Sequence, residues 1–265
     1  MNLSGARPRG PDVLAAATLE WSLYWRRRVR LATVLAAAPV LVAFLIALLK
    51  NLDLPGFDPI LVRGVDALTL LFRWIYFLGL VFFVPLALGI GLVSREVEGK
   101  TLPLLLVRPL SRGSLLLGKF LGASAISGAL LCGSYAVSSL VLLGADGFDG
   151  VGELLPNLPA YVFSLCLGSL AYCALFALLG LVARYAVVIG FAIFLVDSFI
   201  AFLPGLIRNL SVRYHLVSVA PDAALPGIFQ ALSVPSGVEA FFSLSIGTLL
   251  LLAVAMTLFA NRNYV

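Results

Sequence analysis

Few side chains in this sequence could carry out chemistry. The candidates in or beside long apolar stretches are Asp197, the lone histidine His215 and three cysteines, Cys132, Cys166 and Cys173. A membrane-embedded enzyme would need paired carboxylates, a His-x-x-x-His zinc pair or a Ser/His couple at similar depth, and these residues supply none. Three cysteines make no complete disulfide framework. We therefore expect no catalytic, cofactor-binding or metal-binding residue, with the cysteines packed in the apolar interior and His215 at a surface or interface.

One stretch partly fits a phosphate-binding loop. Gly113 to Lys119 has the pattern G-x-x-x-x-G-K, but Phe120 stands where a Mg²⁺-binding Ser or Thr is required. Apolar residues lead from it directly into a long apolar run, and no buried strand precedes it. The stretch is therefore expected to begin a helix, with Lys119 at the inner membrane interface, and any ATPase must be another protein.

Asp197 is the only acidic or basic residue inside an apolar run of membrane-spanning length. It lies about 12 residues beyond Tyr185, or roughly 18 Å along a helix at 1.5 Å per residue, close to the middle of a bilayer. Two interpretations stay open. The carboxyl group could face a polar translocation path or change its protonation. Alternatively, it could have a structural role, protonated or bonded to Ser198, a tyrosine or the backbone of a neighbouring helix.

The composition explains why such residues are scarce. Of the 265 residues, 62% are hydrophobic and only 12% are charged, with a mean hydropathy of +1.08. A soluble domain is about a quarter charged, so this chain has too little polar surface to cover a water-exposed globule. The composition excludes a soluble enzyme, a nucleic-acid binder and a disordered chain.

Six runs are long and apolar enough to cross roughly 30 Å of hydrocarbon, which takes about 20 residues. We expect an all-α polytopic membrane protein with an outer segment, 208–239, that forms re-entrant or interfacial helices. The predicted spans cover residues 31–49, 74–93, 120–143, 160–183, 185–207 and 240–260.

The positions of the basic residues predict the topology. With the N-terminus inside, thirteen Lys and Arg residues fall in inner segments and five in outer ones. This asymmetry is the positive-inside pattern, and it places both termini in the cytoplasm. The sequence pI of about 9.3 thus reflects orientation in the bilayer and gives no reason to expect a nucleic-acid partner.

Two segments precede the first span. Residues 1–11 form a flexible tail rich in Pro, Gly and Arg. Residues 12–30 carry apolar positions at helical spacing, including Trp21, Tyr24 and Trp25, followed by four arginines. Aromatic rings beside an arginine cluster suit an interfacial elbow helix in the headgroup plane, with a plain cytoplasmic helix as the alternative.

The inner loop 94–119 is the most charge-dense part of the chain. Thr101 can cap a short helix, which should end before Pro109 because the residue before proline avoids the helical region. The apolar stretch Leu102 to Val107 is too short to cross a bilayer. It therefore needs a groove to lie in, either the headgroup layer or another protein.

This loop resembles that of the type-2 ABC transporter (ABC-2 type) permeases. In that family a Glu, Gly and Thr precede leucines, a Pro, a Ser-Arg pair and a Gly-Lys. The matching residues here are Glu98, Gly99, Thr101, Leu102, Leu105, Arg108, Pro109 and Arg112. The elbow, six spans, long outer segment and short polar tail fit the same family.

The resemblance implies a permease subunit of an ATP-driven exporter in a prokaryotic cytoplasmic membrane. Its loop would form a coupling helix in a groove of a separate ATPase. Two ATPase copies and a second permease subunit, as a homodimer or heterodimer, complete the expected complex, and ATP and Mg²⁺ bind the ATPase. A secondary transporter or, less in keeping with the residues, a membrane-embedded enzyme is the alternative.

Small residues share one face of the third span. Such residues let membrane helices approach closely, so this stripe is predicted to be a packing face, either within the subunit or across a dimer. The residues of the stripe are Gly118, Gly122, Ala125, Ala129 and Gly133.

Overall fold

The computed structural model describes residues 10–52, 63–92, 112–183, 185–200, 206–220 and 236–261. Residues 10–27, 112, 114, 115, 206 and 207 are described by their backbone alone. Most of the loop 94–119 lies outside these ranges. Its motif residues from Glu98 to Pro109 therefore remain sequence predictions.

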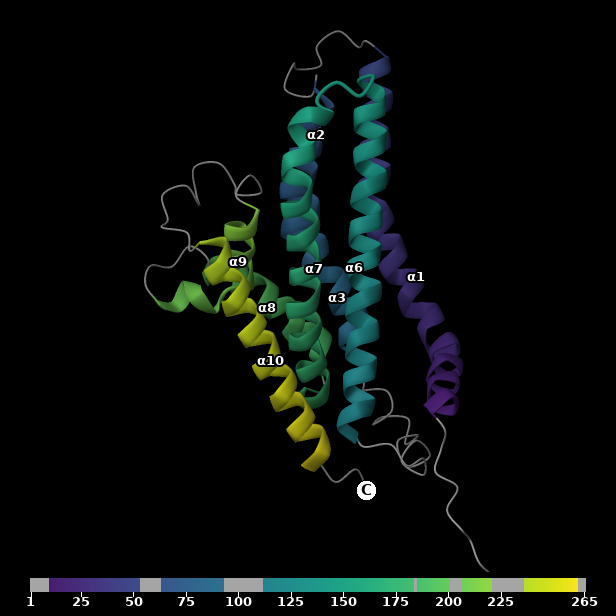
Figure 1. Cartoon of the computed structure of the whole chain (residues 1–265), viewed down its shortest axis with the longest axis vertical. Coiled ribbons are helices and arrows are strands. Elements are labelled where there is room, and N and C mark those ends of the chain that lie inside the picture. Colours follow the sequence, from purple (N-terminus) through teal and green to yellow (C-terminus); the bar gives the residue numbers. More distant parts are fainter. Residues whose placement is uncertain are drawn as a thin grey trace, which may run out of the picture.

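All regular structure among the described residues is helical (Figure 1). Long apolar chains form helices in membranes because each backbone N–H and C=O must find a partner within the segment. The long elements are α1 (Gly10–Asn51), α6 (Arg112–Ala145), α7 (Val151–Val182) and α10 (Gly237–Asn261). A further long helix is made of α2 (Gly64–Leu71), the π-helix η2 (Phe72–Leu80) and α3 (Val81–Gly89). The short elements are α8 (Ala186–Ile200), the 3₁₀-helix η3 (Leu206–Leu210) and α9 (Val212–Val219).

Five of these helices are long and apolar enough to span a membrane: Arg28–Asn51, Gly64–Gly89, Leu116–Ala145, Val151–Val182 and Gly237–Asn261. The all-helical prediction is confirmed, and five predicted spans fall on these helices. All five begin earlier than the sequence suggests, and two of them much earlier, at Gly64 rather than 74 and at Val151 rather than 160. Arg73 lies inside the second long helix, and Pro156 and Pro159 lie inside α7. Both prolines are tolerated because Gly152 and Leu155, whose carbonyls lose their N–H partners, are exposed at the helix start.

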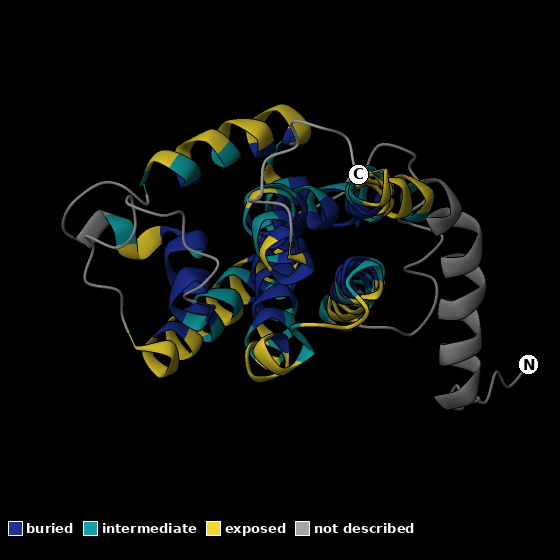
Figure 2. Cartoon of the chain, turned by 90° about the horizontal axis from the view of Figure 1, so that it is seen from above, coloured by how far each residue is buried: buried dark blue, intermediate teal, exposed yellow. Residues whose placement is uncertain are grey.

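The predicted span 185–207 is not found at its expected length. Its described part is α8, whose 15 residues reach about 22 Å at 1.5 Å per residue, short of the roughly 30 Å hydrocarbon layer. In both views α8 lies across the long axis of the bundle (Figures 1 and 2). A count of six spans is therefore not established by this structure.

The ends of the long helices define two opposite ends of the bundle. The first residues of α1, the first of α6 and the last of α10 lie at one end, called the terminal end below (Figure 1). At the opposite, far end, Asp146 joins three helices because it accepts hydrogen bonds from Lys50 of α1 and from the backbone N–H of Gly64. α1 contains both the predicted elbow 12–30 and the predicted first span 31–49 in one helix, and the position of the elbow in the headgroup plane stays a prediction.

The core forms around α7. Two thirds of the most apolar window of α7 is buried, whereas α10 is the least buried long helix at 17%. Buried residues gather in the middle of the bundle and exposed ones at its periphery (Figure 2). α3 packs against α7 with glycines at the contact. A methyl group on Gly89 would lie 2.8 Å from Cβ of Phe176, and one on Gly180 would overlap the carbonyl oxygen of Ile90.

The contact between α6 and α7 makes a testable prediction. The Sγ atoms of Cys132 and Cys166 are 3.6 Å apart, whereas the third thiol, Cys173, is fully buried. A disulfide needs an S–S distance of about 2.05 Å, which small side-chain rotations can supply. Oxidation with copper–phenanthroline in membranes is expected to form an intramolecular Cys132–Cys166 disulfide in most chains. Mass spectrometry of the non-reduced peptides checks this, and Cys173→Ser should leave the yield unchanged. A disulfide that instead involves Cys173 would contradict the register of the two helices.

Candidate functional site

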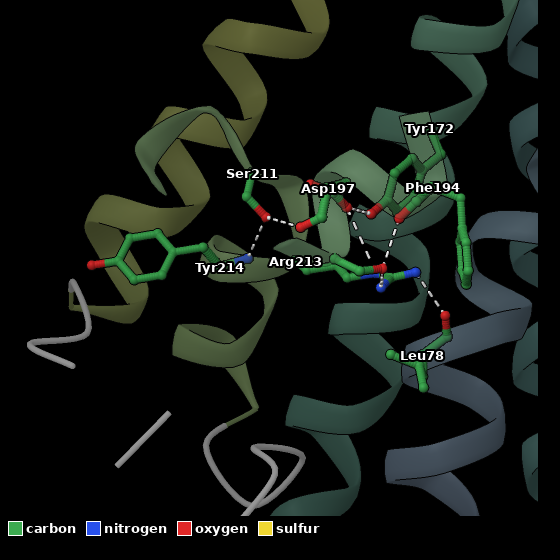
Figure 3. Close-up of polar contacts among 8 residues, drawn as sticks. Leu78, Tyr172, Phe194, Asp197, Ser211, Arg213 and Tyr214 are labelled. Atoms are coloured by element: carbon green, nitrogen blue, oxygen red, sulfur yellow. Dashed lines mark hydrogen bonds and ion pairs between the residues drawn. The ribbon is translucent and has the colours of Figure 1, made fainter. Parts of the chain in front are cut away.

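A buried cluster of charged and polar groups lies where α7, α8 and α9 meet the second long helix (Figure 3). Asp197, near the end of α8, is 7% exposed, and Arg213, near the start of α9, is 3% exposed. Nε of Arg213 lies 3.6 Å from Oδ2 of Asp197. The hydroxyl of Tyr172 on α7 donates a hydrogen bond of 2.6 Å to the same oxygen. These three side chains form an ion pair with a hydrogen-bonded tyrosine inside the bundle.

Arg213 has further partners for both terminal nitrogens of its guanidinium group. Its Nη1 donates to the hydroxyl of Ser198, and Nη2 donates a hydrogen bond of 2.7 Å to the carbonyl of Leu78 in η2. The guanidinium carbon lies 4.5 Å from the centre of the Phe194 ring, a cation–π geometry. We call Tyr172, Asp197, Ser198, Arg213 and the Leu78 carbonyl the charged cluster. It joins four helical elements through one arginine.

The local sequence explains how Arg213 reaches Asp197. Ser211 is the N-cap of α9, and its hydroxyl accepts a hydrogen bond from the N–H of Tyr214. The same hydroxyl donates to the carbonyl of Asp197, at 3.5 Å. One serine therefore starts α9 and fixes it beside the end of α8, which places Arg213 over the carboxylate.

Sequence reasoning located Asp197 but missed Arg213. The alternation of spans assigns Arg213 to the outer segment, yet it is buried inside the bundle. Of the partners considered for a structural role of Asp197, a tyrosine on a neighbouring helix is present as Tyr172; a role of Asp197 in translocation stays a prediction. One signal could have narrowed the search: a buried acid in a membrane needs an opposite charge, and the first basic residues after the span of Asp197 are Arg208 and Arg213.

His215, expected at a surface or interface, is buried between helices. It is 6% exposed, and its Nε2 lies 2.9 Å from the carbonyl of Asn209 and 3.2 Å from the hydroxyl of Ser243 on α10. The residue ties α9 to α10. The structure describes no group of three or more His, Cys, Asp or Glu side chains that could hold a metal ion in the ranges given above.

Two other predicted features can be placed only in part. Arg112 is the first residue of α6, and the pattern Gly113 to Lys119 continues that helix. Lys119 donates a hydrogen bond of 3.4 Å to the carbonyl of Leu92. These residues are helical, as predicted, and do not form a phosphate-binding loop.

The small-residue stripe of α6 faces away from the other described helices. Gly118, Ala125, Ala129 and Gly133 are exposed and Gly122 is half-buried. Nothing lies within 4 Å of a methyl group placed on Gly118 or Gly133. Packing of these two glycines within the described chain is therefore not found, and packing across a dimer stays a prediction.

The fold and the site together define a class of protein. Five long apolar helices make an integral membrane protein, and a buried charge pair within the bundle is typical of membrane proteins that move ions or molecules. Residues 25–264 match the family model described as ABC-2 family transporter protein. The chain belongs to this family and is its membrane component, which is typically the non-catalytic partner of an ATPase. No curated protein matches the chain.

Proposed function

We propose that this chain is the permease subunit of an ATP-driven exporter, and that its loop 94–119 couples the membrane bundle to a separate ATPase. The observation that carries the proposal is the family match over residues 25–264, together with the motif from Glu98 to Arg112. In the sequence, that motif lies between the second and third long helices and directly precedes α6, whose start lies at the terminal end of the bundle (Figure 1).

The charge distribution supports a cytoplasmic position for this end. The basic residues concentrate in the N-terminal segment and in the loop between the second and third spans. The complex then contains two ATPase copies with ATP and Mg²⁺ and a second permease subunit. The segment from α8 to α9 connects the end of α7 to the start of α10, so a membrane crossing by this segment would complete a six-span topology.

In this mechanism, ATP-driven closure of the two ATPases moves the short helix Thr101 to Val107. That movement reorients paired bundles, and the substrate leaves between or along them. Asp197 and the outer segment are where we expect gating. The composition of the spans is equally compatible with antibiotic, lipid, peptide, ion and metal-linked cargos, and an ATPase-stimulation screen would distinguish them.

Charge reversal in the loop tests the ATPase partnership. Glu98→Lys and Arg112→Glu are each expected to reduce co-purification of the ATPase at least tenfold, because both residues flank the short apolar helix that would enter the ATPase groove. The matched control is Glu153→Lys at the far end of the bundle, an exposed carboxylate that should leave the complex intact. The proposal is contradicted if both loop variants associate fully with the ATPase, or if the unmodified chain associates with no ATPase.

A further inference from the structure

The second long helix contains an uncommon element next to the charged cluster. Residues Phe72–Leu80 form a π-helix of nine residues, flanked by α2 and α3. A π-helix has i→i+5 hydrogen bonds, is rare beyond a single turn and occurs frequently at functional sites. Because its turns hold more residues than the turns of an α-helix, specific contacts must favour it over the α-helical pattern.

Contacts with other helices hold η2 at two points. At its middle residue, the hydroxyl of Tyr76 lies 2.8 Å from Oγ of Ser134 and 3.0 Å from Oγ of Ser138, both on α6. Towards its end, the carbonyl of Leu78 accepts the 2.7 Å hydrogen bond from Arg213. η2 is therefore fixed at Tyr76 to the bundle core and at Leu78 to α8 and α9 through the charged cluster.

We call the hydrogen bond from Arg213 to the Leu78 carbonyl the clamp. The backbone on the α3 side of the clamp is weakened. Gly79 follows Leu78, and a glycine in a helix interior costs about 1 kcal/mol relative to alanine. Pro85 lies inside α3 and cannot donate to the carbonyl of Val81. α3 packs closely against α7, with the ring of Phe82 in edge contact with Tyr172 and Phe176 and with glycines such as Gly89 at the contact, so the weak points lie in the backbone itself. The chain from 79 to 85 is thus suited to a change of register.

α3 lies between η2 and the loop 94–119, so a change of register in η2 would also move the chain that enters the loop. α3 ends at Gly89, and the loop 94–119 begins shortly after it. A turn of η2 that returned to the α-helical pattern would move α3 by at most one residue step, about 1.5 Å along and 100° around its axis. Motion imposed on the loop can therefore reach the charged cluster through α3 and η2.

From these contacts we infer that Arg213 is a positioning residue for energy coupling: it holds η2 in its π-helical register until movement of α3 breaks its bond to the Leu78 carbonyl. The inference rests on the proposed function for the source of that movement. The clamp itself depends only on contacts within this chain.

The test uses a variant that removes both charges and keeps the packing. Asp197→Asn retains an acceptor for the hydroxyl of Tyr172, and Arg213→Met retains an unbranched side chain without a donor for Leu78. In the full chain in lipid nanodiscs, amides 76–83 of this double variant are expected to exchange hydrogen at least tenfold faster than in the wild type. Amides of α10 should be unchanged.

A matched control separates the clamp from loss of an ion pair in general. Arg63 and Glu153 form an exposed pair at the start of the same long helix, with side chains 55% and 59% exposed. Arg63→Gln/Glu153→Gln should leave exchange at 76–83 unchanged. If the Asp197/Arg213 double variant also exchanges like the wild type, or if this control accelerates exchange equally, the inference is wrong.

A second measurement tests the link to ATP. In the complex with its co-purified ATPase, trapping with ATP, Mg²⁺ and vanadate is expected to change exchange at 76–83 at least threefold in the wild type and to have no further effect in the double variant. Equal exchange in the trapped and nucleotide-free wild type overturns the coupling role. If no ATPase binds the chain, the proposed function fails, while the nanodisc comparison still decides whether Arg213 holds the register.

Discussion

Replacing Asp197 with alanine is expected to lower the free energy of unfolding by about 3–5 kcal/mol, the usual cost of removing one partner of a buried ion pair. The guanidinium of Arg213 is 3% exposed and cannot lose its proton in a protein. Without the carboxylate it stays charged in the interior, with only a hydroxyl, a carbonyl and an aromatic ring as partners. Tyr172 loses its acceptor as well.

Arg213→Ala should cost less than Asp197→Ala, because the remaining carboxyl group can bind a proton and become neutral. The double variant Asp197→Asn/Arg213→Met should lie within about 1 kcal/mol of the wild type, since replacing a whole buried pair is often neutral. SDS titration of the purified chain in mixed micelles, followed by tryptophan fluorescence, measures all four proteins. A double variant less stable than either single variant would show that the pair stabilises the bundle through more than charge compensation.

The spans could be predicted from the sequence because membrane helices are encoded by uninterrupted apolar runs. The boundaries of the spans are harder to predict, because a charged residue does not always mark the end of a membrane helix. Arg73 marks the predicted start at Trp74, yet the helix begins at Gly64 and carries Arg73 within it. Long basic side chains can reach a polar layer or a partner from inside a helix, so one charge is a weak boundary signal.

The charged cluster shows the limit of sequence reasoning more sharply. Asp197 stands out because it interrupts an apolar run, whereas the burial of Arg213 depends on how α8 packs in the bundle and on Ser211 starting α9 beside Asp197. Tertiary contacts decide both of these events. The π-helical register of η2 is equally hidden, because Phe72–Leu80 is mostly apolar, like the α-helical spans, and its partners come from α6 and α9.

The glycines of this chain differ greatly in how much room their neighbours leave for a larger side chain. A side chain on Gly180 would overlap the carbonyl carbon and oxygen of Ile90, which are backbone atoms that cannot rotate away. Gly180→Leu is therefore expected to force α3 and α7 apart and lower the free energy of unfolding by about 3 kcal/mol, the upper part of the range for overpacking. The same SDS titration measures it.

Two matched variants make the prediction specific to the contact between α3 and α7. Gly152 on α7 has open space around it, so Gly152→Leu should leave the unfolding free energy within about 0.5 kcal/mol of the wild type, as expected for surface sites. Gly133→Leu on the exposed stripe of α6 should likewise leave the folded chain intact. If the stripe packs across a dimer, this variant should instead lower the fraction of dimer in size-exclusion chromatography. A Gly180→Leu protein as stable as Gly152→Leu would mean that α3 can move away from α7 at little free-energy cost. The helix before the coupling loop would then be far more mobile than the close approach of Gly180 to Ile90 indicates.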